Sequence, residues 1–115
     1  MPGLPILLVE DDHDGARILE HVLVDGGYTV EVVGTAAEAY QRLNRGIYAL
    51  VIADLRLPDG DGAQVADDAA ERGIKTAILS GYVYQLTPAA ADRHEVMVKP
   101  MRPGELIRTV RRLIG

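Results

Sequence analysis

Hydrophobic residues along this chain form short apolar runs that alternate with segments of helical spacing. Runs that are apolar or rich in β-branched residues, and bounded by polar or turn residues, predict buried strands. Five such runs occur, at 4–9, 28–33, 48–53, 74–79 and 95–98. Between them, apolar residues recur every three or four positions, as Ala16, Leu19 and Leu23 do, which predicts amphipathic helices.

Local signals mark where these helices begin. Thr35 and Glu38 have the spacing of a capping box, which predicts a helix start. Pro103 suits the first turn of the last helix. The stretch 82–94 is the least regular part of the chain, and we expect only one short turn of helix there. The segment 58–62 has the composition of a turn.

Strands that alternate with helices through short loops indicate the α/β class. Wholly apolar inner strands imply a doubly wound, five-stranded parallel sheet with helices on both faces. A length of 115 residues suits one domain spanning 1–115, large enough to fold without disulfides. We find no internal repeat, low-complexity segment or linker.

Composition narrows the function classes. The chain has no Cys, which excludes a disulfide scaffold, and its aromatic residues are five Tyr. No apolar run approaches the ~20 residues that cross a bilayer, and the start does not resemble a signal peptide, so we expect a cytoplasmic protein without membrane contact. A net charge of −5 argues against direct nucleic-acid binding, as does the lack of a helix-turn-helix.

The last predicted helix is basic, in contrast to the rest of the chain. Arg111 and Arg112 follow Arg108 there at spacings of three and four. Such a stripe is most often a solvated face. The functional alternative is a docking surface for an acidic partner.

Polar residues gather where the predicted strands end. Glu10 and Asp11 follow the first strand, Asp54 the third, Ser80 the fourth and Lys99 the fifth. The carboxyl ends of parallel strands share one edge, where doubly wound sheets bind ligands. Converging carboxylates without Cys favour Mg²⁺, and a lysine with a hydroxyl suits a phosphoryl group. Taken singly, each of these residues could instead be a cap or a solvated side chain.

Four motifs resemble the receiver domain of two-component response regulators. They are the segments 7–12 (LLVEDD), 54–62 (DLRLPDGDG), 80–81 (SG) and 99–100 (KP), in family order and with family-like spacing over nearly the whole chain. The resemblance implies a flavodoxin-like fold with strand order 2-1-3-4-5, which places Asp11 beside Asp54.

The resemblance also implies a metal site and a phosphoacceptor. Asp54 matches the phosphoacceptor and a ligand of Mg²⁺. Asp11 matches the carboxylate that binds the metal directly, and Glu10 the neighbouring acid that acts through a bound water. Arg56 matches the position whose backbone carbonyl completes the site. Asp12 falls outside the set and is expected to be a loop or capping residue.

The remaining motif residues would contact the phosphoryl group. Lys99 resembles the lysine that pairs with the acceptor and then with its phosphoryl group, and the Lys99–Pro100 bond resembles one that is cis in the family. Ser80 resembles the hydroxyl residue that moves to the phosphoryl oxygen. Gly81 leaves room for that group.

The sequence departs from the family pattern at the predicted switch. Val96 stands where most receivers have Tyr or Phe, and the interval from Ser80 to Lys99 is short, so we expect a reduced fourth helix. Small alphaproteobacterial receivers, often associated with HWE-type kinases, look similar. Tyr82 and Tyr84 could replace the aromatic or simply pack at the surface. Tyr82, with Arg56, could also shield the path of an attacking water.

We expect a non-enzymatic response regulator. It would accept a phosphoryl group on Asp54 from a sensor histidine kinase or phosphotransfer protein and signal to a downstream protein target, with a homodimer as one possible state. One alternative is a small phosphohydrolase that forms an aspartyl phosphate, although Arg56 stands where haloacid-dehalogenase-like enzymes have a second Asp. The other is a receiver-like interaction module that is never phosphorylated.

Overall fold

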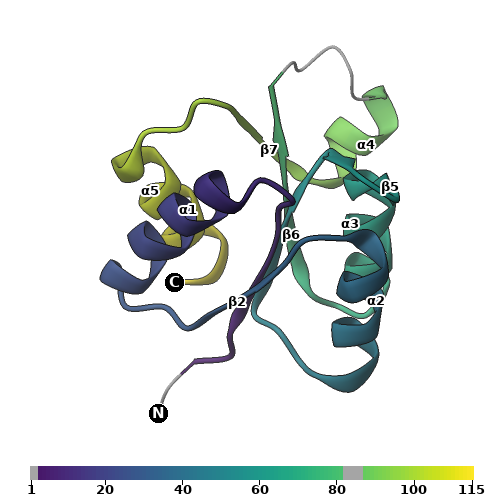
Figure 1. Ribbon diagram of the computed structural model, residues 1–115, viewed down its shortest axis with the longest axis horizontal. Coiled ribbons are helices and arrows are strands. Elements are labelled where there is room, and N and C mark those ends of the chain that lie inside the picture. The colour runs from purple at the N-terminus through teal and green to yellow at the C-terminus, as the bar shows by residue number, and fades with distance from the viewer. Residues whose placement is uncertain (1–2, 82–86) are drawn as a thin grey trace.

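A five-stranded parallel sheet forms the centre of the structure, a computed structural model that describes residues 3–81 and 87–115 (Figure 1). Its strands lie in the order β2-β1-β3-β6-β7. Their bounds are β1 Ile6–Val9, β2 Val30–Val33, β3 Leu50–Asp54, β6 Lys75–Ser80 and β7 Glu95–Val98. The predicted α/β class and strand order are therefore confirmed, because β6 and β7 are the fourth and fifth strands of this sheet.

In the described part of the chain, five helices cover the two faces of the sheet. They are α1 His13–Asp25, α2 Ala36–Arg45, α3 Gly62–Glu71, α4 Pro88–Arg93 and α5 Pro103–Ile114. Figure 1 shows α1 and α5 on one side, with α2, α3 and α4 on the other. Among the described residues, no helix is long and apolar enough to span a membrane. The fourth helix is short, as predicted, with six residues.

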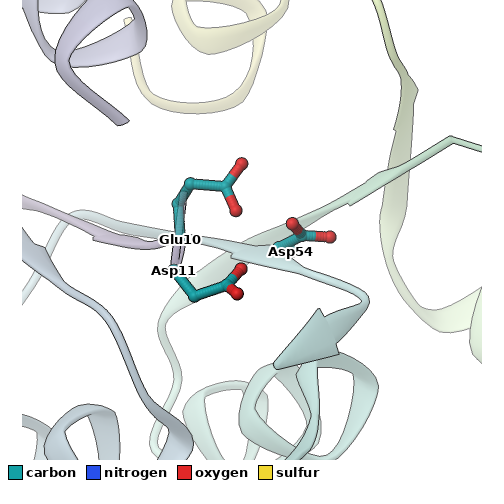
Figure 2. Close-up of side chains that lie close together, drawn as sticks. All are labelled: Glu10, Asp11 and Asp54. Carbon is teal, nitrogen blue, oxygen red and sulfur yellow. The ribbon is translucent and has the colours of Figure 1, made fainter. Parts of the chain in front are cut away.

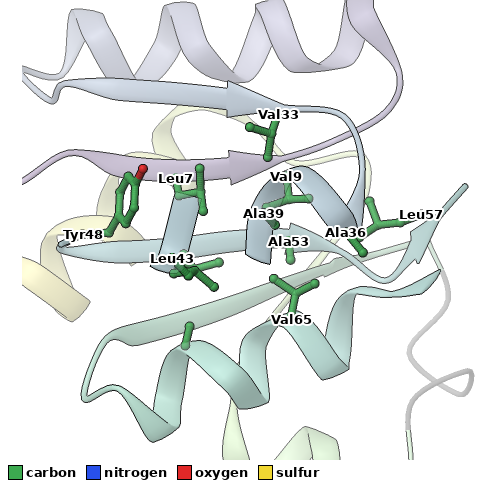
Figure 3. Packing of buried hydrophobic residues seen from close by; sticks show 12 residues of the cluster. Leu7, Val9, Val33, Ala36, Ala39, Leu43, Tyr48, Ala53, Leu57 and Val65 are labelled. Carbon is green, nitrogen blue, oxygen red and sulfur yellow. The ribbon is translucent and has the colours of Figure 1, made fainter. Parts of the chain in front are cut away.

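Alternate residues of the strands point to opposite layers of the core. Leu7 and Val9 pack with residues of α2 and α3 such as Leu43 and Val65 (Figure 3). Their neighbour Leu8 instead packs with residues of α1 and α5. This alternation explains the continuous apolar runs in the sequence, because both faces of each inner strand are buried.

Two segments differ from the sequence prediction in detail. Four of the five strands begin one or two residues later than the apolar runs do, and only β7 begins where its run does. Leu4, for example, is 51% exposed and precedes β1. The predicted turn at 58–62 overlaps a hairpin of two short antiparallel strands, β4 Arg56–Leu57 and β5 Gly60–Asp61, which the sequence did not indicate. A hairpin with two-residue strands has too few residues to show an alternating pattern.

Gly62, at the start of α3, lies against the backbone of Asp54. Its N–H donates to the carbonyl oxygen of Leu55 at 2.8 Å. A Cβ placed on Gly62 would lie 1.9 Å from the carbonyl oxygen of Asp54, and this obstacle is backbone that cannot rotate away. The absence of a side chain therefore lets α3 start next to the end of β3.

We predict that Gly62→Ala lowers the free energy of unfolding by about 1–3 kcal/mol, because the new methyl group overpacks a rigid contact. Chemical denaturation measures the change. Gly104→Ala in α5 is the control, since a Cβ there meets only the end of the Arg108 side chain, at 3.6 Å. That variant should be neutral or slightly stabilising, and equal losses in both variants would contradict the explanation.

Asp59, in the turn between β4 and β5, caps a helix that is distant in sequence. Its carboxylate accepts hydrogen bonds from the N–H groups of Ala36, at 2.7 Å, and Ala37, at 3.0 Å, at the start of α2. These backbone donors lower the pKa of Asp59, and the helix dipole favours a negative charge at this end. The predicted cap at Thr35 is also present, because Thr35 accepts from the N–H of Glu38 at 3.1 Å.

We predict that Asp59→Asn destabilises the domain at neutral pH and that the deficit disappears in acid. A carboxyl whose pKa is lower in the folded state stabilises the fold above its ordinary pKa, and this contribution is lost as the pH falls through the folded-state pKa. Denaturation of both proteins at a series of pH values tests this. A deficit that stays constant into strong acid would show that the charge of Asp59 is unimportant.

Candidate functional site

Three carboxylates converge at the carboxyl edge of the sheet. Glu10 and Asp11 directly follow β1, and Asp54 is the last residue of β3. The two strands are parallel neighbours with Val9 beside Ala53, so their ends lie together. One carboxylate oxygen from each acid lies within 4.8 Å of the others (Figure 2).

Lys99, which follows β7, joins this cluster. Its Nζ lies 3.0 Å from Glu10 Oε1 and 2.8 Å from Asp54 Oδ2. Burial tends to lower the pKa of Lys99, but the hydrogen bonds with Asp54 and Glu10 outweigh it and the pKa is raised. Lys99 therefore bridges the two buried acids as a stable cation.

Glu10 is the most strongly perturbed group of the site. Only 4% of the residue is exposed. Burial, reinforced by the hydrogen bond and charge of Asp54 and opposed by Lys99, raises the pKa of Glu10 to about 7. Among the described residues, Glu10 Oε2 is buried without a hydrogen-bond partner. One lysine is thus insufficient to satisfy this cluster.

The residues present fit a magnesium ion. All three side chains offer oxygen atoms, which are the ligands that Mg²⁺ prefers. Asp11 is exposed, so a metal could reach the site from solvent. The N–H of Arg56 donates to Asp54 Oδ1 at 3.3 Å, which places the backbone of Arg56 beside the acceptor. A ligand role for its carbonyl remains a prediction.

Ser80 and Gly81 lie at the end of the neighbouring strand. Ser80 is 1% exposed and its carbonyl accepts from the N–H of Lys99 at 2.9 Å. Among the described residues, a Cβ on Gly81 would meet no atom within 4 Å. The Lys99–Pro100 bond is cis, as the resemblance implied.

Of the residues proposed for the switch, Val96 lies within the described part of the chain. Val96 is half-buried in β7 and packs against a cluster that includes Ile78 and Ala90. Tyr82 and Tyr84 lie outside the described residues, so the hypotheses about them stay predictions. Of the two roles expected for Asp12, the structure shows the cap, because its side chain accepts from the N–H of Gly15 at 3.1 Å.

Sequence reasoning did not identify a cavity of about 660 Å³ beside Glu10 and Lys99. Gly15 and Met101 contribute to its lining. A side chain on Gly15 would start 2.8 Å from Asp12 Oδ2 and 3.7 Å from Glu10 Oε1, so this glycine keeps the space open. The available sequence signal was a glycine directly before the helical periodicity that begins at Ala16.

Comparison with known proteins agrees with this geometry. The chain is 32% identical over 114 residues to the response regulator receiver protein CpdR of Brucella abortus, covering 95% of each. It is 26% identical to the transcriptional regulatory protein DltR of Streptococcus agalactiae, of which it spans 50%.

Two similar solved structures are more than 25% identical in sequence to this chain. One is the response regulator TrrA of Thermotoga maritima in complex with Mg²⁺ and BeF, with a TM-score of 0.88, 27% identity and coverage of 98% of this chain and 99% of that one. The other is the receiver domain of a sensor histidine kinase from Pseudomonas aeruginosa with magnesium in its active-site cleft, with a TM-score of 0.86, 28% identity and coverage of 98% of both. The model of the family described as "Response regulator receiver domain" matches residues 6–111 of this chain. This chain therefore belongs to the response regulator receiver domain family.

Proposed function

We propose that this receiver accepts a phosphoryl group on Asp54 in a Mg²⁺-dependent reaction and then signals through protein contacts. The observation that carries the proposal is the position of Asp54 between the acids Glu10 and Asp11 and the cation Lys99. Receiver domains are signalling domains whose partners are histidine kinases or phosphotransfer proteins and downstream targets. A phosphohistidine on such a protein is the proposed donor.

The chemistry is a transfer between two residues. A carboxylate oxygen of Asp54 attacks phosphorus and the phosphorus–nitrogen bond of the donor breaks. The donor imidazole, already protonated on its other ring nitrogen, leaves as a neutral ring. The product is an acyl phosphate on Asp54. When bound, Mg²⁺ would neutralise the phosphoryl oxygens. Catalysis then consists mainly of positioning and electrostatics.

Residues on the other side of Asp54 would hold the transferred group. Lys99 already contacts Asp54 Oδ2 at 2.8 Å, so its ammonium can exchange the carboxylate oxygen for a phosphoryl oxygen with little movement. Ser80 would supply a hydroxyl donor from the end of β6, and the lack of a side chain at Gly81 would leave room for the group.

The partners of this particular chain are part of the proposal. A sensor histidine kinase or phosphotransfer protein would act in the cytoplasm, and a downstream protein or a second copy would read the phosphorylated state. Arg108 and Arg111 are exposed on α5 and suit an acidic partner. Arg112 is less available, because its Nη2 lies 2.7 Å from Glu95 Oε2.

We predict that incubation with acetyl phosphate and Mg²⁺ gives one phosphoryl adduct by intact mass and that Asp54→Asn gives none. Asp12→Asn is the matched control, since Asp12 belongs to the same acidic run but caps α1. It should label normally. An adduct that persists in Asp54→Asn would sink the assignment of the acceptor.

The same experiment separates the alternatives. A receiver gives a lasting adduct, whereas a phosphohydrolase gives rapid release of inorganic phosphate with little adduct. An interaction module that is never phosphorylated gives neither. The intact cluster of Asp54, Asp11 and Lys99 favours the first result.

We predict opposite effects of two substitutions on Mg²⁺ affinity, measured by calorimetry without a phosphodonor. Asp11→Asn should weaken binding by about tenfold or more because it removes a charged ligand. Lys99→Gln should tighten it several-fold because a competing cation beside Glu10 and Asp54 is removed. Unchanged affinity in both variants would place the ion elsewhere.

A further inference from the structure

The short helix α4 has little apolar anchoring. Of its six residues, only Ala90 is buried, where it meets a cluster formed by Leu55, Ala66 and Ile78. Six residues are too few for a helix to be stable alone in water. Other contacts must therefore hold α4 in place.

A polar network at the end of α4 supplies these contacts. The ring of His94, the C-cap residue, has no exposed side-chain surface. Its Nε2 lies 2.6 Å from Asp67 Oδ1 on α3, and its Nδ1 lies 2.5 Å from Thr76 Oγ1 on β6. Arg93 adds two hydrogen bonds to Asp67, from Nε at 3.1 Å and from Nη2 at 3.0 Å.

For a neutral His94 ring, the chemistry of its partners determines the direction of each hydrogen bond. The hydrogen bond from His94, and then that from Arg93, lowers the pKa of Asp67, so its carboxylate is ionised and only accepts. In a neutral ring, Nε2 must then carry the proton, and Nδ1 accepts from the hydroxyl of Thr76. Both ring nitrogens are satisfied inside the protein, and loss of either partner would leave one buried without a hydrogen bond.

We propose that Asp67, Thr76, His94 and Arg93 form a clamp that holds α4 on the domain. Because these side chains anchor α4 more than apolar packing does, opening the clamp detaches α4 as one unit while the sheet stays folded. The clamp joins three elements, α3, β6 and the end of α4, through side chains. It lies at the start of β6 and β7, whereas Ser80 and Lys99 lie at or directly after their other ends. This device is independent of the phosphoryl chemistry at Asp54.

Hydrogen exchange of segment 87–94 tests the clamp. The N–H groups of Ala91 and His94 donate within α4, to the carbonyls of Thr87 and Ala90. Thr76→Val removes the hydroxyl partner of His94, and Asp67→Asn replaces the carboxylate shared by His94 and Arg93 with a neutral amide that has one acceptor oxygen instead of two, both with little change of shape. Each should accelerate exchange in this segment by about tenfold or more, while β1 and β3 exchange as in the wild type.

Asp68→Asn is the matched control on the same helix. Asp68 Oδ2 accepts from Arg72 Nε at 3.1 Å, and Arg72 ties α3 to α2 through the carbonyl of Leu43 at 2.9 Å. Exchange in α4 should therefore stay unchanged in this variant. Equal acceleration by Asp67→Asn and Asp68→Asn, a uniform acceleration of the whole chain, or an α4 that is already unprotected in the wild type would overturn the proposal.

The imidazole proton offers a second measurement that needs no stable variant. In the wild type, the Nε2 proton of His94 should give an observable NMR signal because it is buried and hydrogen-bonded. His13 and His21 are exposed internal controls whose ring protons should exchange with water too fast to appear. Absence of the His94 signal in the wild type would contradict the clamp.

Discussion

The repulsion between two buried acids, Glu10 and Asp54, is the constraint on which the site depends. Parallel pairing of β1 and β3 forces their ends together, and Lys99 is the cation that bridges them. Because Asp11 adds a third carboxylate, one lysine leaves the cluster with excess negative charge. That excess makes the edge of the sheet suited to a divalent cation and, with the cation bound, to a phosphoryl group.

Backbone contacts around the acids keep this arrangement rigid. Gly62 lets α3 begin directly against Asp54, and Asp59 fastens the intervening turn to the start of α2. Phosphoryl transfer depends on positioning more than on covalent chemistry, so a fixed acceptor is a functional requirement. The same contacts hold the backbone of Arg56 beside Asp54.

The other side of the domain is built differently. Helix α4 relies on side-chain hydrogen bonds of His94 and on a single buried alanine, whereas α1 and α5 share an extensive apolar core. Val96, in the middle of β7, packs against the same cluster as Ala90. The domain thus combines a rigid acceptor site with a lightly anchored helix.

The sequence alone predicted the five strands, the capped helix at Thr35 and the polar residues at the strand ends, because periodicity and caps are local signals. Once the resemblance supplied the strand order, the convergence of Asp11 and Asp54 followed. Only the tertiary structure showed Asp59 on α2 and His94 between Asp67 and Thr76. These contacts join residues 18 to 27 positions apart, and nothing in the local pattern distinguishes such a carboxylate or imidazole from a solvated one.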